Sequence, residues 1–223
     1  MAAKSSRGIT VCMTAATPAV ATPIVPTAIV AYAATGTSPA GVTVDVPTQP
    51  AVGEVVSFAD TGFASLDGKS FVVTALDAAT GFKVGGVALG TGTLGVSPKV
   101  MHYVESTDIT CLCLSSLSIS EDTPGTVSVA TFCDPSASLP ATSTSAGSIA
   151  FAGFVDVASK DYPALLAAVA DGKPRVIRIT LPSNGYIVAP LIFSSMTYDL
   201  PLDGAVGFSG TAALSSKPMH LWA

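Results

Sequence analysis

Residues 175–214 read RVIRITLPSNGYIVAPLIFSSMTYDLPLDGAVGFSGTAAL. Val, Ile, Thr and Phe dominate its apolar runs, and Gly, Pro, Asp and Ser separate them, which is typical of strands joined by turns. The turn Pro182–Gly185 contains Asn-Gly, a pair that tolerates positive φ and closes tight hairpins. The stretch therefore predicts three antiparallel strands: Arg175–Leu181, Tyr186–Ser195 and Ala205–Leu214.

Pro190 lies inside the second of these strands. Proline has no N–H to donate to a ladder, so we expect an edge strand or a bulge at this position.

The same pattern continues toward the N-terminus, where one segment differs. Three further strands are expected at Ile109–Ser118, Thr126–Phe132 and Ser148–Val155. Between them and residue 175, Asp161–Gly172 has proline near its start, alanine and leucine inside and glycine at its end, which predicts a short helix. Leu165, Leu166 and Val169 have the spacing of one buried stripe.

Residues 41–93 form a separate group of short strands. Glu54–Phe58, Lys69–Thr74 and Gly81–Val84 are apolar runs separated by Thr-Gly and Asp-Gly turn signals. About 50 residues of this kind make a small β module near the lower limit of independent stability.

The chain is unusually poor in charge for its length. Of 223 residues 11% are charged and 49% are hydrophobic, and the mean hydropathy is +0.59. A typical soluble domain has roughly 25% charged residues. So large an uncharged surface usually marks contacts with other chains.

The most apolar segment is Ile9–Ala34, and its hydropathy suggests two interpretations: a membrane span or a signal peptide. Pro18, Pro23 and Pro26 interrupt it, so it lacks the ~20 apolar residues of a spanning helix. Lys4 and Arg7 before it, and the small residues around Tyr32, fit a secretory signal. We expect no membrane insertion and a retained N-terminus, with a cleaved signal as the alternative.

The net charge of −5 argues against a nucleic-acid-binding surface, which needs clustered cations. Lys173, Arg175 and Arg178 are the nearest approach to a cluster, and we expect them to be solvated positions on one strand.

The cysteines are Cys12, Cys111, Cys113 and Cys133. They lack the ligand spacing of a zinc site. Buried free thiols are the expected state, although the sequence leaves a disulfide open.

Catalytic motifs are missing as well. His102 and His220 have no nucleophile motif beside them, and the glycine pairs near residues 85–92 are not followed by the Lys-Ser/Thr of a phosphate loop. Glu121-Asp122 precedes Thr-Pro-Gly and is interpreted as a turn. The sequence therefore predicts no enzyme, no catalytic, cofactor-binding or metal-binding residue, and no cofactor.

The order of features in the C-terminal 120 residues resembles the major tail-tube proteins of long-tailed bacteriophages with flexible, non-contractile tails. Most weight falls on the Asp-Leu-Pro-Leu-Asp-Gly turn, which precedes the last strand. The segments that carry the resemblance are Thr126–Pro135, Gly147–Asp156, Ala170–Gly172, Arg178–Pro182, Phe193–Gly204 and Ala205–Leu214.

This resemblance implies a mainly β fold: a tail-tube β-sandwich with one flanking α-helix, plus a small inserted β module. Residues 1–40 and 94–223 would form the sandwich, and 41–93 the insertion, on the outer surface. It also implies a structural virion protein, assembled in the bacterial cytoplasm, whose hexameric rings stack into a hollow tube. Its expected partners are other copies, a tape-measure protein, tail-tip and terminator proteins, and viral DNA that passes through without specific binding.

Two other non-enzymatic classes remain open on the sequence, and a hydrolytic enzyme is the third alternative. A secreted or surface β-sandwich adhesin or carbohydrate-binding module would use Tyr103, Tyr186 and Trp222 as a sugar platform. A different virion protein, such as a decoration or terminator subunit, would share the assembly role without forming the tube.

Overall fold

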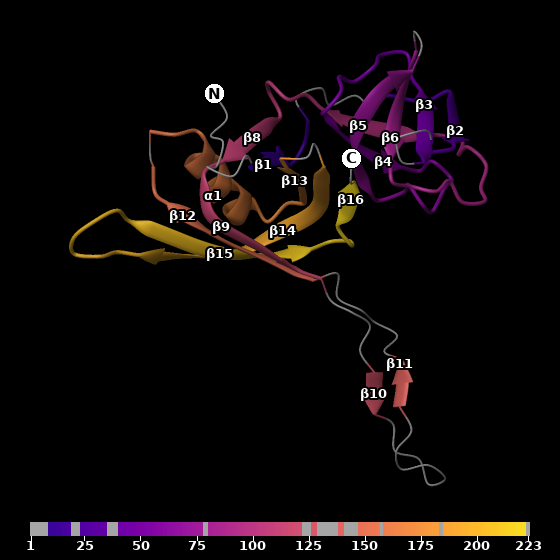
Figure 1. Ribbon diagram of the computed structural model, residues 1–223. Helices are drawn as coiled ribbons and strands as arrows, with labels where there is room; N and C mark the ends of the chain where they lie inside the picture. Colours follow the sequence, from indigo (N-terminus) through magenta and orange to yellow (C-terminus); the bar gives the residue numbers. More distant parts are fainter. Residues whose placement is uncertain are drawn as a thin grey trace.

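The computed structural model describes residues 9–18, 23–34, 40–77, 80–121, 126–128, 138–140, 147–156, 158–182 and 185–221. Within these ranges the chain is mainly β, with two antiparallel sheets, a separate two-stranded hairpin and one helix (Figure 1). The expected fold class is confirmed.

The first sheet is built mostly from the C-terminal half of the chain. Its strands follow the order β8-β1-β13-β14-β15-β12-β9, and β16 also pairs with β14. Their bounds are β1 Thr10–Thr14, β8 Ile109–Leu112, β9 Leu114–Ser120, β12 Ser148–Phe154, β13 Arg175–Thr180, β14 Tyr186–Asp199, β15 Gly207–Leu214 and β16 Met219–Leu221.

This sheet folds over on itself to make a sandwich. β8 and β9 are consecutive in sequence yet lie at opposite ends of the strand order, and the long strand β14 belongs to both layers. One layer contains β8, β1, β13 and the start of β14, whereas the other contains the rest of β14, β15, β12 and β9. A register shift in β14 between Phe193 and Ser195 marks the passage between them.

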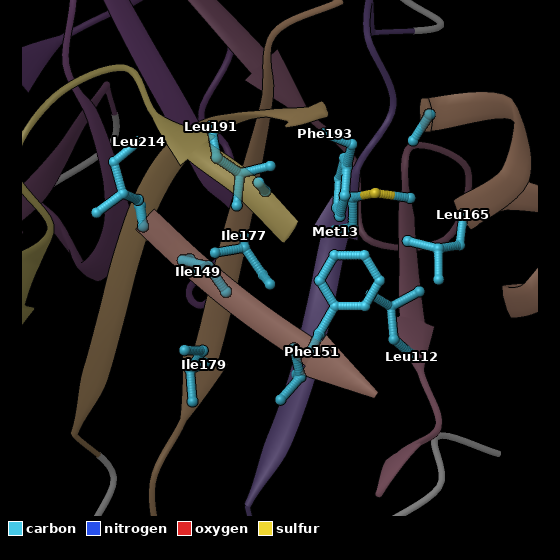
Figure 2. Close-up of a cluster of buried hydrophobic side chains, with 14 of the residues drawn as sticks. Met13, Leu112, Ile149, Phe151, Leu165, Ile177, Ile179, Leu191, Phe193 and Leu214 are labelled. Atoms are coloured by element: carbon cyan, nitrogen blue, oxygen red, sulfur yellow. The ribbon is translucent and has the colours of Figure 1, made fainter. Parts of the chain in front are cut away.

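The core lies between these two layers. Figure 2 shows Ile177 and Met13 from one layer meeting Ile149 and Phe151 from the other. Phe151 packs edge-on against Phe193 at 5.5 Å between ring centroids. Alternating inward residues on each strand supply this core, as the sandwich prediction requires.

Helix α1 (Asp161–Asp171) packs on the side of the sandwich, against β8 and β14. Leu165 and Ala168 are buried in the same core, and Val169 packs against it. Gly172 ends the helix in the left-handed conformation (φ 58°), a common C-terminal cap. The helix prediction is confirmed, although Ala168 rather than Leu166 completes the buried stripe.

The second sheet has the order β2-β3-β6-β5-β4-β7. Ile24 and Val100 exchange two backbone hydrogen bonds, of 2.9 and 2.8 Å, so the chain before β2 pairs with β7 and closes the sheet into a small barrel. Its strands are β2 Ala28–Tyr32, β3 Gly41–Asp45, β4 Val55–Ala59, β5 Ser70–Asp77, β6 Gly81–Gly85 and β7 Lys99–Tyr103. The expected module at 41–93 lies within this barrel, which also takes in β2 and β7.

A third group consists of β10 (Thr126–Ser128) and β11 (Ser138–Pro140), which pair only with each other in the described part of the chain. Figure 1 shows them standing away from both sheets.

The predicted hairpin is confirmed for its strands, because β13 and β14 pair antiparallel and the N–H of Leu181 donates to the oxygen of Gly185 at 2.8 Å. Ser183 and Asn184 of the turn lie outside the described residues. Pro190 does not lie on an edge strand. It sits where β14 changes partner from β16 to β15, so the missing N–H falls between two ladders.

Candidate assembly surfaces

The layer formed by β14, β15, β12 and β9 has two edges without a partner strand in the described residues. β9 pairs only with β12. β14 pairs with β13 only as far as Leu191, so from Ile192 to Asp199 the side that β13 leaves is uncovered. Such edges present unpaired N–H and C=O groups to another chain.

The two edge strands run in opposite directions. All neighbours in the layer are antiparallel, and the layer has four strands, an even number. Copies related by rotation would therefore bring β9 of one copy beside β14 of the next in antiparallel orientation.

The face of this layer that points away from the core is made of small, mostly hydroxyl-bearing residues. The cross-strand registers place them in two neighbouring rows, each of which runs across all four strands. The rows are Ser116–Ala152–Ser209–Thr197 and Ser118–Ala150–Thr211–Ser195.

Hydroxyls of this face pair with each other across β14 and β15. The Oγ of Ser195 lies 2.8 Å from Oγ1 of Thr211, and Oγ1 of Thr197 lies 2.9 Å from Oγ of Ser209. The face is hollowed, with a volume of about 660 Å³, and no charged residue lines the hollow. The solvated face of an antiparallel sheet is normally polar, and on this face the polar side chains are small and uncharged.

One end of the same layer is apolar. Leu200 and Leu202 in the β14–β15 turn are 72% and 105% exposed, and Tyr198 and Phe154 beside them are 47% and 62% exposed. We call these four residues the apolar tip. The sequence shows this exposed apolar turn as two leucines that flank Pro201. There the motif supported only the family resemblance, not a contact surface.

A polar network joins the two sheets. Arg178 on β13 donates to Oε1 of Glu105 at 2.8 Å and to the oxygen of Gly53 in the barrel. The N–H of Glu105 donates to Glu54 at 3.2 Å, and Glu54 contacts Nε2 of His102 at 2.5 Å. An apolar cluster lies beside the network: Val55, Val72, Tyr103, Val176, Val188 and Leu221.

Glu54 is the buried acid of this network. Burial alone would raise the pKa of Glu54, but hydrogen bonds from the Ala51 N–H, His102 and the Glu105 N–H hold that pKa below its ordinary value. The carboxylate is therefore the form that the folded chain favours.

The expectation for the basic cluster was wrong for two of its three residues, whereas Lys173 is exposed as expected. Arg175 and Arg178 are 9% and 5% exposed, because each is held by a partner inside the protein. Arg175 pairs with Asp171 at 2.7 Å, four residues earlier in the chain.

The expectation of free thiols was wrong for two of the cysteines. Cys12 and Cys111 are direct neighbours on β1 and β8 and form a disulfide. Cys113 is free but exposed rather than buried, because β8 ends before it, and Cys133 lies outside the described residues. The Cys-Leu-Cys spacing does not identify Cys12 as the partner, because Cys12 lies 99 positions away in the sequence.

Both histidines pair with carboxylates. His102 contacts Glu54, and Nε2 of His220 lies 2.7 Å from Oε1 of Glu121. The proposed sugar platform is not assembled: Tyr103 is buried at 8% exposure, Tyr186 is half-buried, and Trp222 lies outside the described residues.

The described ranges contain no group of three or more His, Cys, Asp or Glu residues placed to hold a metal ion. None of the helical residues described here forms a segment with the length and hydropathy needed to cross a bilayer.

No protein-family model and no curated protein matches the chain. Two of the solved structures that align with it come from gene transfer agent (GTA) particles. One is from the tail of an empty particle with C6 symmetry; it has 19% identity and a TM-score of 0.38, and the alignment covers 48% of this chain and 81% of that one. The other is from the virion of the native particle; it has 18% identity and a TM-score of 0.38, and the alignment covers 48% and 84% of the two chains.

Proposed function

We propose that this chain is the subunit of a phage-type tail tube, and that rings form when β9 of one copy pairs with the exposed edge of β14 in the next. The observation that carries the proposal is the pair of oppositely directed free edges on one four-stranded layer. Each added copy extends the sheet and presents the same two edges again. Ring closure leaves no edge exposed.

The hydroxyl face then lines the lumen. The opposite face of the layer is covered by β1, β13 and the rest of the core, so only the hollowed face is available to the interior. Six copies would contribute four strands each. Barrels of about 16 strands already enclose an aqueous channel, so the ring would be hollow.

DNA would pass this wall without specific binding because the hollow carries no cation to hold phosphates. The chain as a whole has a net charge of −5, which would repel DNA. The lining residues are uncharged, so neutrality replaces repulsion as the proposed reason for free passage.

The barrel built from β2 to β7 would then be a decoration on the outside of the tube. It has its own closed sheet and core, so it offers no long free edge to the ring. The remaining proposed partners are a tape-measure protein in the lumen and tip and terminator proteins at the tube ends. The proposed location is the virion, after assembly in the bacterial cytoplasm.

Engineered cysteines test the ring contact directly. Within one copy, Ser118 on β9 and Ser195 on β14 are separated by three strand spacings of roughly 4.8 Å, too far for a disulfide, which needs Cα atoms within about 7 Å. Between neighbouring copies they become adjacent. A chain with S118C and S195C, oxidised after assembly, should give a covalent ladder that ends at six chains on a non-reducing gel.

A second pair, S118C with T197C, tests the case in which the register between copies is shifted by two residues. Cys113 and Cys133 are replaced by serine in every variant. The matched control is S118C with T211C, because Thr211 lies on the interior strand β15. A ladder from an edge pair and none from the control supports the proposal. Assembled particles that give no ladder with either edge pair would overturn this ring contact.

A further inference from the structure

The apolar tip is distinctive because its four large side chains gather at one end of the layer. Single exposed apolar residues are ordinary, but clustered ones mark a contact. Leu202 is fully exposed and Leu200 nearly so, and both belong to the turn that joins β14 to β15. Pro201 between them restricts the backbone of the turn, including that of Leu200 before it. Less conformational entropy is therefore lost when the leucines dock against a partner.

The tip is anchored rather than loose at its base. Phe154 and Asp199 are both paired with Gly207, so three strands end together there. The hydroxyl of Tyr198 is bonded to the hydroxyl of Tyr162 on α1 at 3.2 Å. A fixed apolar surface of this kind suits a partner that docks in one orientation.

The opposite end of the layer has different chemistry. There β9 ends at Ser120 and β12 begins at Ser148, so β10 and β11 leave the body from this end (Figure 1). A two-stranded hairpin is marginally stable in water by itself, so β10 and β11 also need a partner surface.

The two ends also differ in charge: the tip carries exposed acids, and the opposite end carries an exposed lysine beside the ion pair of Glu121 and His220. Asp199 and Asp203 are exposed at the tip. Lys217, just beyond the end of β15 at the opposite end, is exposed and makes no ion pair with the described residues. Contact between unlike ends is heterologous, and such contacts continue into an open-ended polymer.

We infer that the apolar tip is the axial contact of the assembly and that its occupant is the opposite end of a second copy, which carries Lys217 and the β10–β11 hairpin. This inference rests on the proposed tube function and assigns its stacking surface. The free edges of β9 and β14 join copies around the ring, whereas the tip joins one ring to the next.

The test replaces both leucines in the full chain, L200N together with L202N. The matched control is V96N, because Val96 is 103% exposed but belongs to the barrel side of the molecule. Circular dichroism and melting temperature should be unchanged in both variants, since these side chains are exposed. In electron microscopy the control should form tubes like the parent chain, and the double variant should form rings with at least tenfold less tube mass. Tubes of parental length from the double variant would overturn the inference.

A mixing experiment identifies the occupant. The double variant keeps its opposite end, so at one part in ten it should join parental rings and stop growth, which shortens the tubes several-fold. Parental tubes of unchanged length at this ratio would show that growth does not pass from the tip of one copy to the opposite end of the next, and the assignment of the occupant would then be wrong. The proposed tube function has a separate test: it is wrong if the parental chain itself forms neither rings nor tubes.

Discussion

Arg178 and Glu105 form an ion pair of 2.8 Å that connects the sandwich to the segment leading out of the barrel. The guanidinium is 6% exposed and also donates to Gly53, so a single side chain contacts the first sheet, the barrel and the connection between them. The barrel is therefore held in a defined position on the sandwich.

Replacing Arg178 by methionine should loosen this junction. The substitution removes hydrogen bonds to a carboxylate and a backbone oxygen, each of which contributes about 1–3 kcal/mol. Glu105 is 56% exposed and can be solvated once its partner is gone, so we expect a total loss of about 2 kcal/mol rather than the larger penalty of a stranded buried charge. Urea unfolding measures it, with K173M as the control for loss of a cation, because Lys173 is exposed and lies outside the proposed contacts. An unchanged midpoint for R178M would contradict the role given to this residue.

Glu54 should make the stability of the chain depend on acid pH. Its pKa is lower in the folded chain than its ordinary value of 4.5, so its contribution is complete above pH 4.5 and disappears as the pH falls through the folded value. E54Q should lower the free energy of unfolding by about 1–3 kcal/mol at pH 7, because the buried network loses the carboxylate charge and one of its two acceptor oxygens. The difference from the parental chain should shrink below pH 4. A difference that stays constant between pH 7 and pH 3 would show that the carboxylate charge is not involved.

The disulfide between Cys12 and Cys111 should be a large contributor to stability. It closes a loop of 99 residues that contains the whole barrel. In the chain-entropy model such a loop stabilises the folded state by about 4–5 kcal/mol. Paired replacement by alanine should therefore lower the free energy of unfolding by several kcal/mol, and a reducing agent should abolish the difference. C113S is the matched control and should behave like the parental chain with and without reductant.

The whole barrel should be removable without unfolding the sandwich. The N–H of Ala15 donates to the oxygen of Asp108 at 2.6 Å, so the chain enters and leaves the barrel at adjacent points. Replacing residues 16–107 with two glycines should leave a folded sandwich that still assembles, with a lower melting temperature because Val176, Val188 and Leu221 lose their cover. Deleting only 41–93 should misfold, since it leaves β2 and β7 without partners. A folded short chain that no longer assembles would place the barrel in the ring contact.

The sequence predicted the parts of this fold that depend on local pattern. Runs rich in Val, Ile, Thr and Phe between turn residues located β12 to β15, and the proline, alanine and glycine positions located α1, because these signals act within a few residues. The full length of the barrel escaped prediction for a physical reason. Its closure depends on Ile24 meeting Val100 across 76 residues of chain, and no local pattern reports such a pairing.

The assembly surfaces were predicted only in kind. Scarcity of charge led to the expectation of contacts with other chains, but which strands are edges depends on the order of strands in the sheet. Arg178 shows the same limit: its neighbours in sequence suggested a solvated position, whereas its neighbours in space, Glu105 and Gly53, allow it to be buried.

Electron microscopy of the purified full chain tests the central claim most directly. The account predicts hollow tubes of stacked rings whose inner wall is a continuous sheet, with β9 of each copy against β14 of the next. A chain that stays a dispersed monomer at high concentration, or that forms rings in which these two edges remain apart, would contradict it.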